Sequence, residues 1–363
     1  MSWLWVIVGF SLLIILHEGG HYVAAKATGM RVERFVLFLG PPVWSFKRGE
    51  TEYGIAAIPL GGYVKITGMN PEEEMPPEVE HRAYYRQPVW KRIVVIAAGP
   101  AVNIALAFAI FTFAYLFFAQ RTNQSVGAIR SGTPAAKSLQ PDDQILAVDG
   151  ERFSGLEQEA RLTRFGNLVA SHKCEGKQVD GCRSATPVTL EIRRGGAVHT
   201  LSVYPEYKKE YGKALIGFTY GSEAADIGLG GAVSRAGRSM WLITHQTASI
   251  FSHIFESEQR KQISGIVGVS DVAHETIEVG IFPSLLLLGL VSLSLGLINL
   301  LPILPLDGGH IFWSIVEKMR GEPTSLRVVE RATVIGFALV AMLIVVGLTN
   351  DIGRITGEGF NVR

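Results

Sequence analysis

Two histidines and a glutamate follow directly on an apolar run near the start of the chain, in the sequence LLIILHEGGHYVAAK. His17, Glu18 and His21 form the pattern H-E-x-x-H. On a helix, side chains four residues apart project from one face, so two imidazoles can bind one zinc ion while the glutamate handles a water molecule. The alternative is a polar patch packed inside a bundle. Within a membrane that alternative is costly, because no water satisfies the three polar groups.

A catalytic zinc site needs a third protein ligand and keeps one position open for water. Asp307 is the first charged residue after the uncharged stretch Val279–Leu306, in the sequence LINLLPILPLDGGH. The prolines and glycines around Asp307 break the helix, which a membrane tolerates only where the backbone is buried in protein or lines a wet cavity. The alternative is an ordinary helix end with its usual turn residues. We expect Asp307 to be the third ligand of one zinc ion, with His310 as the second choice.

The composition predicts that these residues are carried by a membrane protein. Of 363 residues, 48% are hydrophobic and only 18% are charged, against about 25% charged in an ordinary soluble domain. The net charge of +1 gives no reason to expect a nucleic-acid partner. Four segments are apolar over a spanning length: Met1–Ala27, Ile93–Gln120, Val279–Leu306 and Ala332–Asn350. The first lacks the basic start and the small-residue cleavage site of a secretory signal, so we expect it to be retained.

The distribution of lysine and arginine predicts the orientation of the four spans. Basic residues gather between the first and second spans and again between the third and fourth. The positive-inside rule places both of these segments in the cytoplasm. Both termini and the long middle region are then extracytoplasmic. The histidine pair is expected in the cytoplasmic half of the bilayer, because His17 lies about 21 Å along a helix that enters from outside near Trp3.

The chain becomes polar between Gln124 and Glu206, with turn residues at short intervals. The sequence VTLEIRRGGAVHTLSVYPE alternates apolar and polar residues around Gly195 and Gly196, which predicts a β-hairpin. The stretch GTPAAKSLQPDDQILAVDG resembles a PDZ domain of the bacterial protease type. Such a domain captures a peptide by strand addition to an exposed edge. The alternative role is that of a spacer or steric plug without a ligand.

The two cysteines, Cys174 and Cys182, are close enough in sequence to close a small disulfide loop in an oxidising compartment. From Tyr207 to Glu278 the sequence favours a linker followed by a helix lying along the outer membrane surface. The expected domains are a first membrane part at residues 1–123, the PDZ-like domain at 124–206, this linker and surface segment at 207–278, and a second membrane part at 279–363.

HEGGH in the first span, NLLPILPLDGG in the third and the PDZ-like insertion between them resemble the site-2 protease family of intramembrane zinc metalloproteases, within it the regulator of sigma E protease group of bacteria. The resemblance covers nearly the whole chain. It implies that His17, His21 and Asp307 bind zinc. It also implies that Glu18 is the catalytic base and that Asn299 is a polar residue beside the substrate.

The stretch GETEYGIAAIPLGGYVKITGM is similar to the membrane-re-entrant β-hairpin of this family, which we expect between Glu50 and Ile66. An edge strand of that hairpin can pair with an unwound substrate helix and satisfy its backbone. The residues expected to contact the substrate are Ile58, Gly61, Gly62 and Tyr63. AAGPAVNIALA at the second span is also similar to the family.

One position departs from the family pattern. Gly19 stands where the family usually has a bulkier apolar residue, and Gly19 and Gly20 each weaken a helix by about 1 kcal/mol relative to alanine. This departure concerns local packing and leaves the ligand set unchanged.

The resemblance implies an intramembrane zinc endopeptidase of the bacterial inner membrane. Its expected partners are the lipid bilayer and a single-span membrane protein such as an anti-sigma factor, with no nucleic acid. A second interpretation is a non-catalytic, PDZ-bearing scaffold with a metal site, although a structural site has no need of the base Glu18. A third is a metal transporter, but the sequence lacks the paired repeats that many transporters show.

Overall fold

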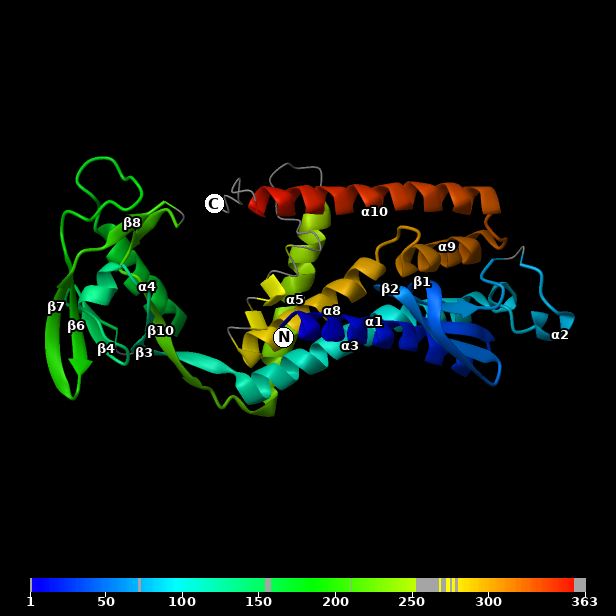
Figure 1. Cartoon of the computed structure of the whole chain (residues 1–363), viewed down its shortest axis with the longest axis horizontal. Coiled ribbons are helices and arrows are strands. Elements are labelled where there is room, and N and C mark those ends of the chain that lie inside the picture. The colour runs from blue at the N-terminus through cyan, green and yellow to red at the C-terminus, as the bar shows by residue number, and fades with distance from the viewer. Residues whose placement is uncertain are drawn as a thin grey trace. The chain divides into compact units, whose positions relative to one another are not determined.

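The computed structural model describes residues 2–70, 73–153, 158–209, 211–252, 268, 272–274, 276–277 and 280–355 (Figure 1). The chain divides into two compact units. The helical unit runs from the N-terminus to Phe118 and resumes at Ile227, and the β-rich unit is Ala119–Asp226.

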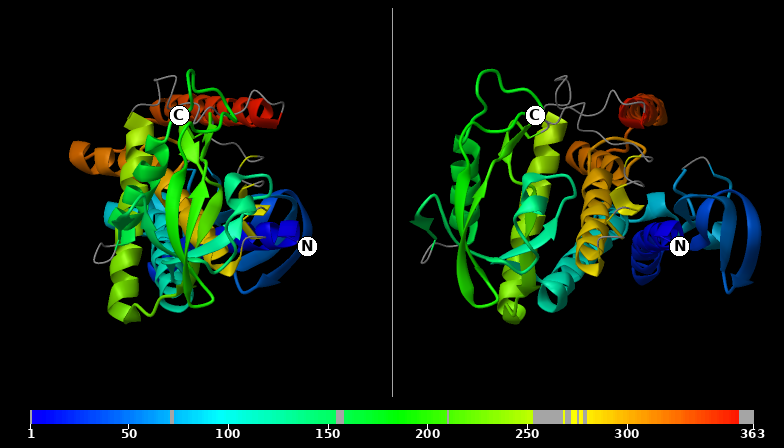
Figure 2. Two further views of the ribbon diagram at one scale, coloured as in Figure 1. Left: turned by 90° about the vertical axis from the view of Figure 1, so that its left-hand side faces the viewer. Right: turned by 60° about the vertical axis from the view of Figure 1, so that its left-hand side comes forward.

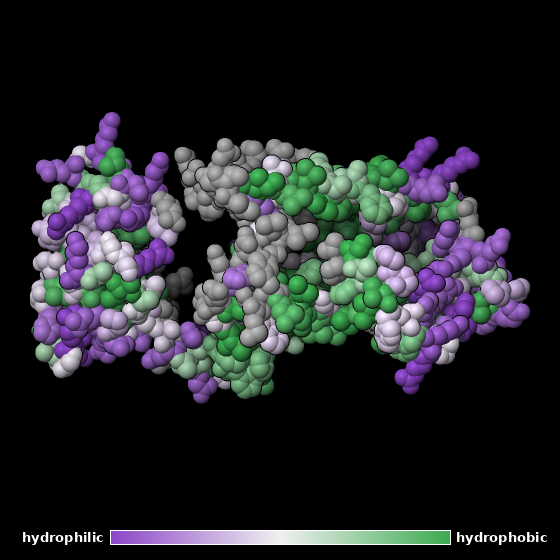
Figure 3. Space-filling view, in the orientation of Figure 1, coloured by the Kyte–Doolittle hydropathy of each residue, from purple (hydrophilic) through white to green (hydrophobic). Residues whose placement is uncertain are grey.

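Four helices of the helical unit are long and apolar enough to cross a membrane. They are α1 (Ser2–Ala27), α3 (Val89–Phe118), α8 (Ile281–Asn299) and α10 (Leu326–Ile355). Hydrophobic residues cover these helices in the space-filling view of Figure 3. Hydrophilic residues gather over the hairpin of β1 (Val32–Arg48) and β2 (Thr51–Ile66) and over α2 (Pro77–Glu80). The expected spans are therefore present as helices, although their bounds differ: α8 ends at Asn299, seven residues before the predicted end at Leu306, and α10 begins at Leu326, six residues before the predicted start at Ala332.

Helix α3 is the centre of the helical unit, because α1, α5 (Gly228–Ser252), α8 and α9 (Asp307–Arg320) all pack against it (Figure 2). A buried cluster joins three of these helices: Phe111 of α3 packs with Leu293 of α8 and Ala236 of α5. Gly289 lets the ring of Phe111 approach α8, since a Cβ at this glycine would lie 2.8 Å from it. Small residues thus let the helices come close together.

Helix α5 corresponds to the helix expected along the outer membrane surface. Its buried residues Ala232 and Ala236 have no exposed area, and it contacts both α3 and α8. Its position relative to a bilayer stays a prediction. Residues 253–267, which belong to the same expected segment, lie outside the described residues.

The long antiparallel hairpin of β1 (Val32–Arg48) and β2 (Thr51–Ile66) follows α1. The prediction placed the whole hairpin between Glu50 and Ile66, which is wrong: that segment is the single strand β2, and the turn is at Gly49 and Glu50. The partner strand was not foreseen, because glycine and two prolines interrupt the alternation of VERFVLFLGPPVWSFKR. Two short elements, α2 (Pro77–Glu80) and the 3-10 turn η1 (Tyr84–Arg86), lead into α3.

The elements of the β-rich unit are β3 (Gln120–Ile129), η2 (Pro134–Lys137), β4 (Gln144–Val148), β5 (Glu151–Arg152), α4 (Gln158–Ser171), β6 (Val188–Arg194), β7 (Ala197–Val203), β8 (Glu206–Lys208), β9 (Lys213–Leu215) and β10 (Phe218–Ala224). Its sheet has the strand order β10-β3-β4-β6-β7, and β5 pairs with β4. Its buried core consists of aliphatic residues, most of them from the strands, with Phe153 and Phe165. The expected hairpin at Gly195 and Gly196 is confirmed, and a disulfide joins Cys174 to Cys182.

The first part of the expected linker is instead part of this unit. Strands β8 and β9 pair with each other, and β10 pairs with β3 from Phe218 to Ala224. The backbone N–H of Ala225 donates to the carbonyl oxygen of Ala119 at 2.9 Å, so the chain enters and leaves the β-rich unit at adjacent points. The sequence did not predict these strands because two of them are only three residues long.

Candidate functional site

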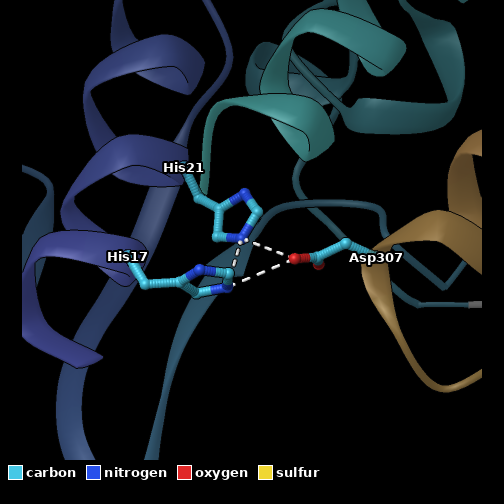
Figure 4. A group of neighbouring side chains, drawn as sticks. All are labelled: His17, His21 and Asp307. Atoms are coloured by element: carbon cyan, nitrogen blue, oxygen red, sulfur yellow. Dashed lines mark hydrogen bonds and ion pairs between the residues drawn. The ribbon is translucent and has the colours of Figure 1, made fainter. Parts of the chain in front are cut away.

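The side chains of His17, His21 and Asp307 point toward one another (Figure 4). The histidines come from one face of α1 and the aspartate from the first residue of α9. The Oδ2 atom of Asp307 lies 3.2 Å from Nε2 of His17 and 3.3 Å from Nε2 of His21, and the two Nε2 atoms are 3.3 Å apart. Both histidines are 7% exposed. The structure therefore brings a pair of neighbouring histidines together with an aspartate that lies 286 residues after His21 in the sequence.

The chemistry of this donor set fits a zinc ion. Each residue offers one ligand atom, and the three atoms lie within 4.8 Å of one another. The Oδ2 of Asp307 is buried and makes no hydrogen bond within the described part of the chain, although both imidazole nitrogens are at ion-pair distance. Two imidazole nitrogens and a carboxylate oxygen are ligands that zinc accepts, and three protein ligands leave a position for water.

Glycines on α1 and α3 allow the two helices to meet at the site. A Cβ at Gly99 of α3 would lie 2.3 Å from Nε2 of His21. A Cβ at Gly20 of α1 would lie 2.6 Å from the carbonyl oxygen of Ala98. Both distances are too short for real atoms, so these two positions require glycine. Gly19 differs, since a Cβ there meets nothing within 4 Å. The close approach explains one glycine of HEGGH and leaves the other without a structural reason.

The break between α8 and α9 positions Asp307. Helix α8 ends at Asn299, the chain is irregular to Leu306, and Asp307 then begins α9. Gly308 lies against the backbone of this irregular segment, because a Cβ there would be 2.3 Å from the carbonyl oxygen of Leu300. From the other side, Gly336 of α10 lies against Leu304, where a Cβ would come within 1.5 Å of the carbonyl oxygen. Backbone packing on both sides holds the loop that precedes the aspartate.

A buried ion pair ties the far end of α9 to α3. The guanidinium of Arg92 donates two hydrogen bonds to the carboxylate of Glu317, one of them at 2.9 Å. The side chain of Arg92 is only 9% exposed and that of Glu317 is 23% exposed. The guanidinium also lies 5.8 Å from the ring centroid of Tyr84, and burial raises the pKa of that tyrosine to about 12. The helix that carries Asp307 is therefore fixed to the helix that packs against His21.

Strand β2 passes directly beside Glu18. A Cβ at Gly62 would lie 3.0 Å from Cγ of Glu18 and 3.3 Å from the side chain of Ile14. Glu18 is partly buried, on the turn of α1 between the two histidines. A residue with a side chain at position 62 would displace this carboxylate. The glycine predicted to contact the substrate thus lies next to the residue predicted to be the base.

The strand beside Glu18 is an edge of a sheet. Residues 32–37 of β1 pair with Gly62–Ile66 on one side and with residues 52–55 of β2 on the other. Residues 42–48 pair with the outer side of residues 51–56. Within the described residues, nothing pairs with the outer side of Tyr63 and Val64. This edge leaves backbone groups available to a further strand.

The other residues predicted for the site do not belong to the group of convergent ligand atoms. The side chain of Asn299 donates to the carbonyl oxygen of Leu295 at 3.0 Å, within the last turn of α8. His310 lies one turn after Asp307 on α9, and the group of convergent ligand atoms contains Asp307 instead. Ile58 of β2 is 47% exposed and lies against Gly40.

The sequence did not predict the residues that contact the Nδ1 atoms of the two histidines. Nδ1 of His21 lies 2.9 Å from the backbone carbonyl oxygen of Val95. Nδ1 of His17 lies 3.3 Å from the side-chain amide of Asn103. Both partners come from α3. The signal was present in AAGPAVNIALA, where a lone asparagine in an apolar span needs a polar partner, but the sequence does not say which partner.

Comparison with known proteins identifies what this chain is similar to. Residues 5–343 match the model of the family described as "Peptidase family M50". A protein of Rhizobium meliloti (strain 1021) named "Putative zinc metalloprotease" is 30% identical over 375 residues, which cover 96% of this chain and 95% of that protein. "Zinc metalloprotease Rip1" of Mycobacterium tuberculosis (strain ATCC 25618 / H37Rv) is 30% identical over 356 residues, which cover 88% of each chain.

Proposed function

The chain belongs to peptidase family M50 and is a zinc metalloprotease with several apolar helices; we propose that it is an intramembrane endopeptidase whose substrates are single-span membrane proteins. The family predicted from the sequence is thereby confirmed. The observation that carries the proposal is the buried cluster of His17, His21 and Asp307, whose histidines project from a helix apolar enough to span a bilayer. A protease with its ligands at this place reaches peptide bonds within or near a membrane helix.

We assign the zinc to Nε2 of His17, Nε2 of His21 and the carboxylate of Asp307. Zinc, when bound, supplies Lewis-acid polarisation of the peptide carbonyl and lowers the pKa of a water molecule to about 7. Glu18 takes a proton from the attacking water and passes it to the nitrogen of the leaving amine. The peptide C–N bond breaks, and the oxygen of the water stays on the new carboxyl group. Glu18 is suited to this role by its place between the two histidines and by the open side that Gly62 leaves.

The free edge of β2 supports a role in opening the substrate. A peptide bond in a helix has its N–H and C=O groups already paired, and opening the helix strands these groups in hydrocarbon. An edge strand can pair with the unwound segment and satisfy its backbone. The outer side of Tyr63 and Val64 is such an edge, and Gly62 of the same strand lies against Glu18. We therefore assign substrate pairing to this part of β2, and Asn299 to a polar contact beside the opened helix.

The β-rich unit is assigned to the extracytoplasmic side, as a PDZ-like domain that favours shortened substrates. Its support is the order of the elements in GTPAAKSLQPDDQILAVDG and the edge strand β10, which pairs only with β3 within the described sheet. Peptide-end capture on an edge and exclusion of bulky substrates are the two ways such a unit can select. An anti-sigma factor of the bacterial inner membrane, trimmed outside by another protease, is the substrate we propose.

Cleavage of a defined reporter by the purified protein in detergent tests this function. The reporter carries one transmembrane helix between two soluble domains, and the matched control replaces that helix with a polar linker of equal length. We expect zinc-dependent products whose masses place the cut within or next to the apolar segment. Cutting of the polar linker alone would show a zinc protease of soluble segments, and the intramembrane assignment would then be wrong.

A further inference from the structure

Each of the two histidines has one ring nitrogen in the cluster and one that faces α3. Nδ1 of His21 lies 2.9 Å from the carbonyl oxygen of Val95, which can only accept a hydrogen bond. This contact therefore places the proton of His21 on Nδ1 and leaves the lone pair of Nε2 directed at Asp307. A neutral imidazole needs this tautomer to bind a metal through Nε2.

The atom that contacts Nδ1 of His17 is a hydrogen-bond donor instead of an acceptor. Nδ1 of His17 lies 3.3 Å from Nδ2 of Asn103, an amide nitrogen that can only donate. With this amide orientation Nδ1 would accept and the proton of His17 would be on Nε2, within the group of ligand atoms. A proton on that atom is incompatible with zinc binding through it.

The side chain of Asn103 is placed to remove this incompatibility. The residue has no exposed area, and its Oδ1 is buried without a hydrogen-bond partner within the described residues. Rotation of the carboxamide by 180° exchanges its oxygen and nitrogen and leaves its shape nearly unchanged. The backbone around it is held, since the hydroxyl of Ser292 on α8 donates to the carbonyl oxygen of Asn103 at 2.8 Å. The rotated amide presents Oδ1 to Nδ1 of His17.

We propose that Asn103 is a positioning residue that selects the tautomer of His17: with its amide oxygen turned to the ring, it accepts from Nδ1–H and leaves Nε2 free to bind zinc. Both histidines then donate from Nδ1 to an oxygen on α3, one to a backbone carbonyl and one to the Asn103 side chain. Contacts of this kind orient ligand histidines, and their loss costs about 10- to 100-fold in metal affinity. The inference rests on the proposed ligand set and adds a residue to it.

Zinc affinity, measured on the full-length protein in detergent by competition with a chelator, tests the proposal. Asn103→Leu keeps the size of the side chain and removes the acceptor, so zinc should bind about 10- to 100-fold more weakly. Asn103→Asp keeps an acceptor oxygen at the same place, so its affinity should return to within a few-fold of the wild type. Thr112→Val is the matched control, because it also removes from α3 a buried polar atom that has no hydrogen-bond partner in the described part of the chain. We expect it to bind zinc as the wild type does.

A second readout keeps the test decisive if Asn103→Asp fails to fold. Zinc-loaded, 15N-histidine-labelled wild type should give two slowly exchanging imidazole N–H signals from the ligand pair. Asn103→Leu should keep the signal held by Val95 and lose or shift the other.

Two outcomes overturn the inference: zinc binding by folded Asn103→Leu that equals the wild type, or folded Asn103→Asp that binds as weakly as Asn103→Leu. His17→Ala separates this failure from a failure of the proposed site. If His17→Ala loses zinc while Asn103→Leu keeps it, only the role of Asn103 is wrong. If His17→Ala binds zinc normally, the ligand set itself is wrong.

Discussion

Gly99 of α3 lies against the imidazole of His21, and a Cβ at this glycine would come within 2.3 Å of Nε2. The absence of a side chain at one position of α3 therefore decides where a proposed ligand on α1 can lie. Gly20 of α1 likewise lies against the backbone of Ala98, the residue before Gly99. The distance between these two helices, set by glycines, is thus part of the site.

Gly99→Ala should lower the zinc affinity by at least about tenfold. This is the lower end of the loss in metal affinity that follows when a contact orienting a ligand histidine is removed. The physical reason is the overlap of the new methyl group with the His21 ring. Zinc content after purification and affinity by chelator competition measure the effect. Gly19→Ala is the matched control, because a Cβ there meets nothing within 4 Å and should stabilise α1 by up to about 1 kcal/mol. Equal zinc affinity in Gly99→Ala and the wild type would contradict the close packing.

Breaking the ion pair between Arg92 and Glu317 should destabilise the helical unit. Glu317→Leu leaves the buried guanidinium without its carboxylate, at a cost on the order of 3 kcal/mol. The double variant Arg92→Met with Glu317→Leu removes both charges and should recover most of the loss. Thermal unfolding midpoints in one detergent provide the comparison. Additive losses in the double variant would show that the two residues do not act as a pair.

Acid should weaken the contact between the hairpin turn and the segment before α3. Hydrogen bonds from Arg82, at 2.7 and 2.8 Å, with a further one from Lys26, lower the pKa of Glu50 to about 2. The unfolded value is about 4.3, so the folded form has the lower pKa. The stabilisation of the folded protein by these contacts of Glu50 is fully present above the unfolded pKa, and it is lost as the pH falls from about 4 toward 2.

Comparison of Glu50→Gln with the wild type checks this pH dependence. The variant should unfold at a lower temperature at pH 7, and the difference should shrink as the pH approaches 3. Glu78→Gln is the control, since Glu78 is an exposed carboxylate of α2 with no ion pair recorded among the described residues. A constant difference between Glu50→Gln and the wild type from pH 7 to pH 3 would rule out the proposed linkage.

Proline in the edge segment of β2 should impair cleavage without loss of zinc. Along an edge strand, every second backbone N–H group points away from the sheet. One of the two single variants Tyr63→Pro and Val64→Pro therefore removes an outward-pointing donor. We expect that variant to cleave a single-helix reporter at least tenfold more slowly. Val43→Pro lies on the opposite edge of the hairpin, in a segment that already contains two prolines, and should cleave normally. Unchanged rates in both edge variants would exclude pairing of the substrate with this strand.

The sequence predicted the parts of the site that are written in short motifs. H-E-x-x-H gives the histidine pair directly, because helical spacing alone places both side chains on one face. Asp307 was identified as the first charge after a long apolar stretch, and the structure brings it within 3.3 Å of both histidines. The four apolar helices followed from composition and length, since hydropathy determines such segments locally.

The remaining features depend on long-range contacts that no local pattern contains. Asn103 and Val95 could not be matched to their histidines without knowing how α3 lies against α1. Strand β1 was missed because Phe38 and Gly40 have positive φ angles and prolines follow, which removes the period-two pattern of a regular strand. The same limit applies to the short strands β8 and β9, which only their pairing defines.

The most direct test of the proposed chemistry compares the wild type with Glu18→Gln at matched zinc content, on a reporter with one transmembrane helix. The substitution keeps the size and hydrogen-bonding capacity of the side chain and removes its ability to take a proton. We predict that both proteins hold one zinc per chain and that cleavage by Glu18→Gln falls by at least about 100-fold, the lower end of what a general base contributes. Cleavage by Glu18→Gln at the wild-type rate, with zinc retained, would contradict the assignment of Glu18 as the base.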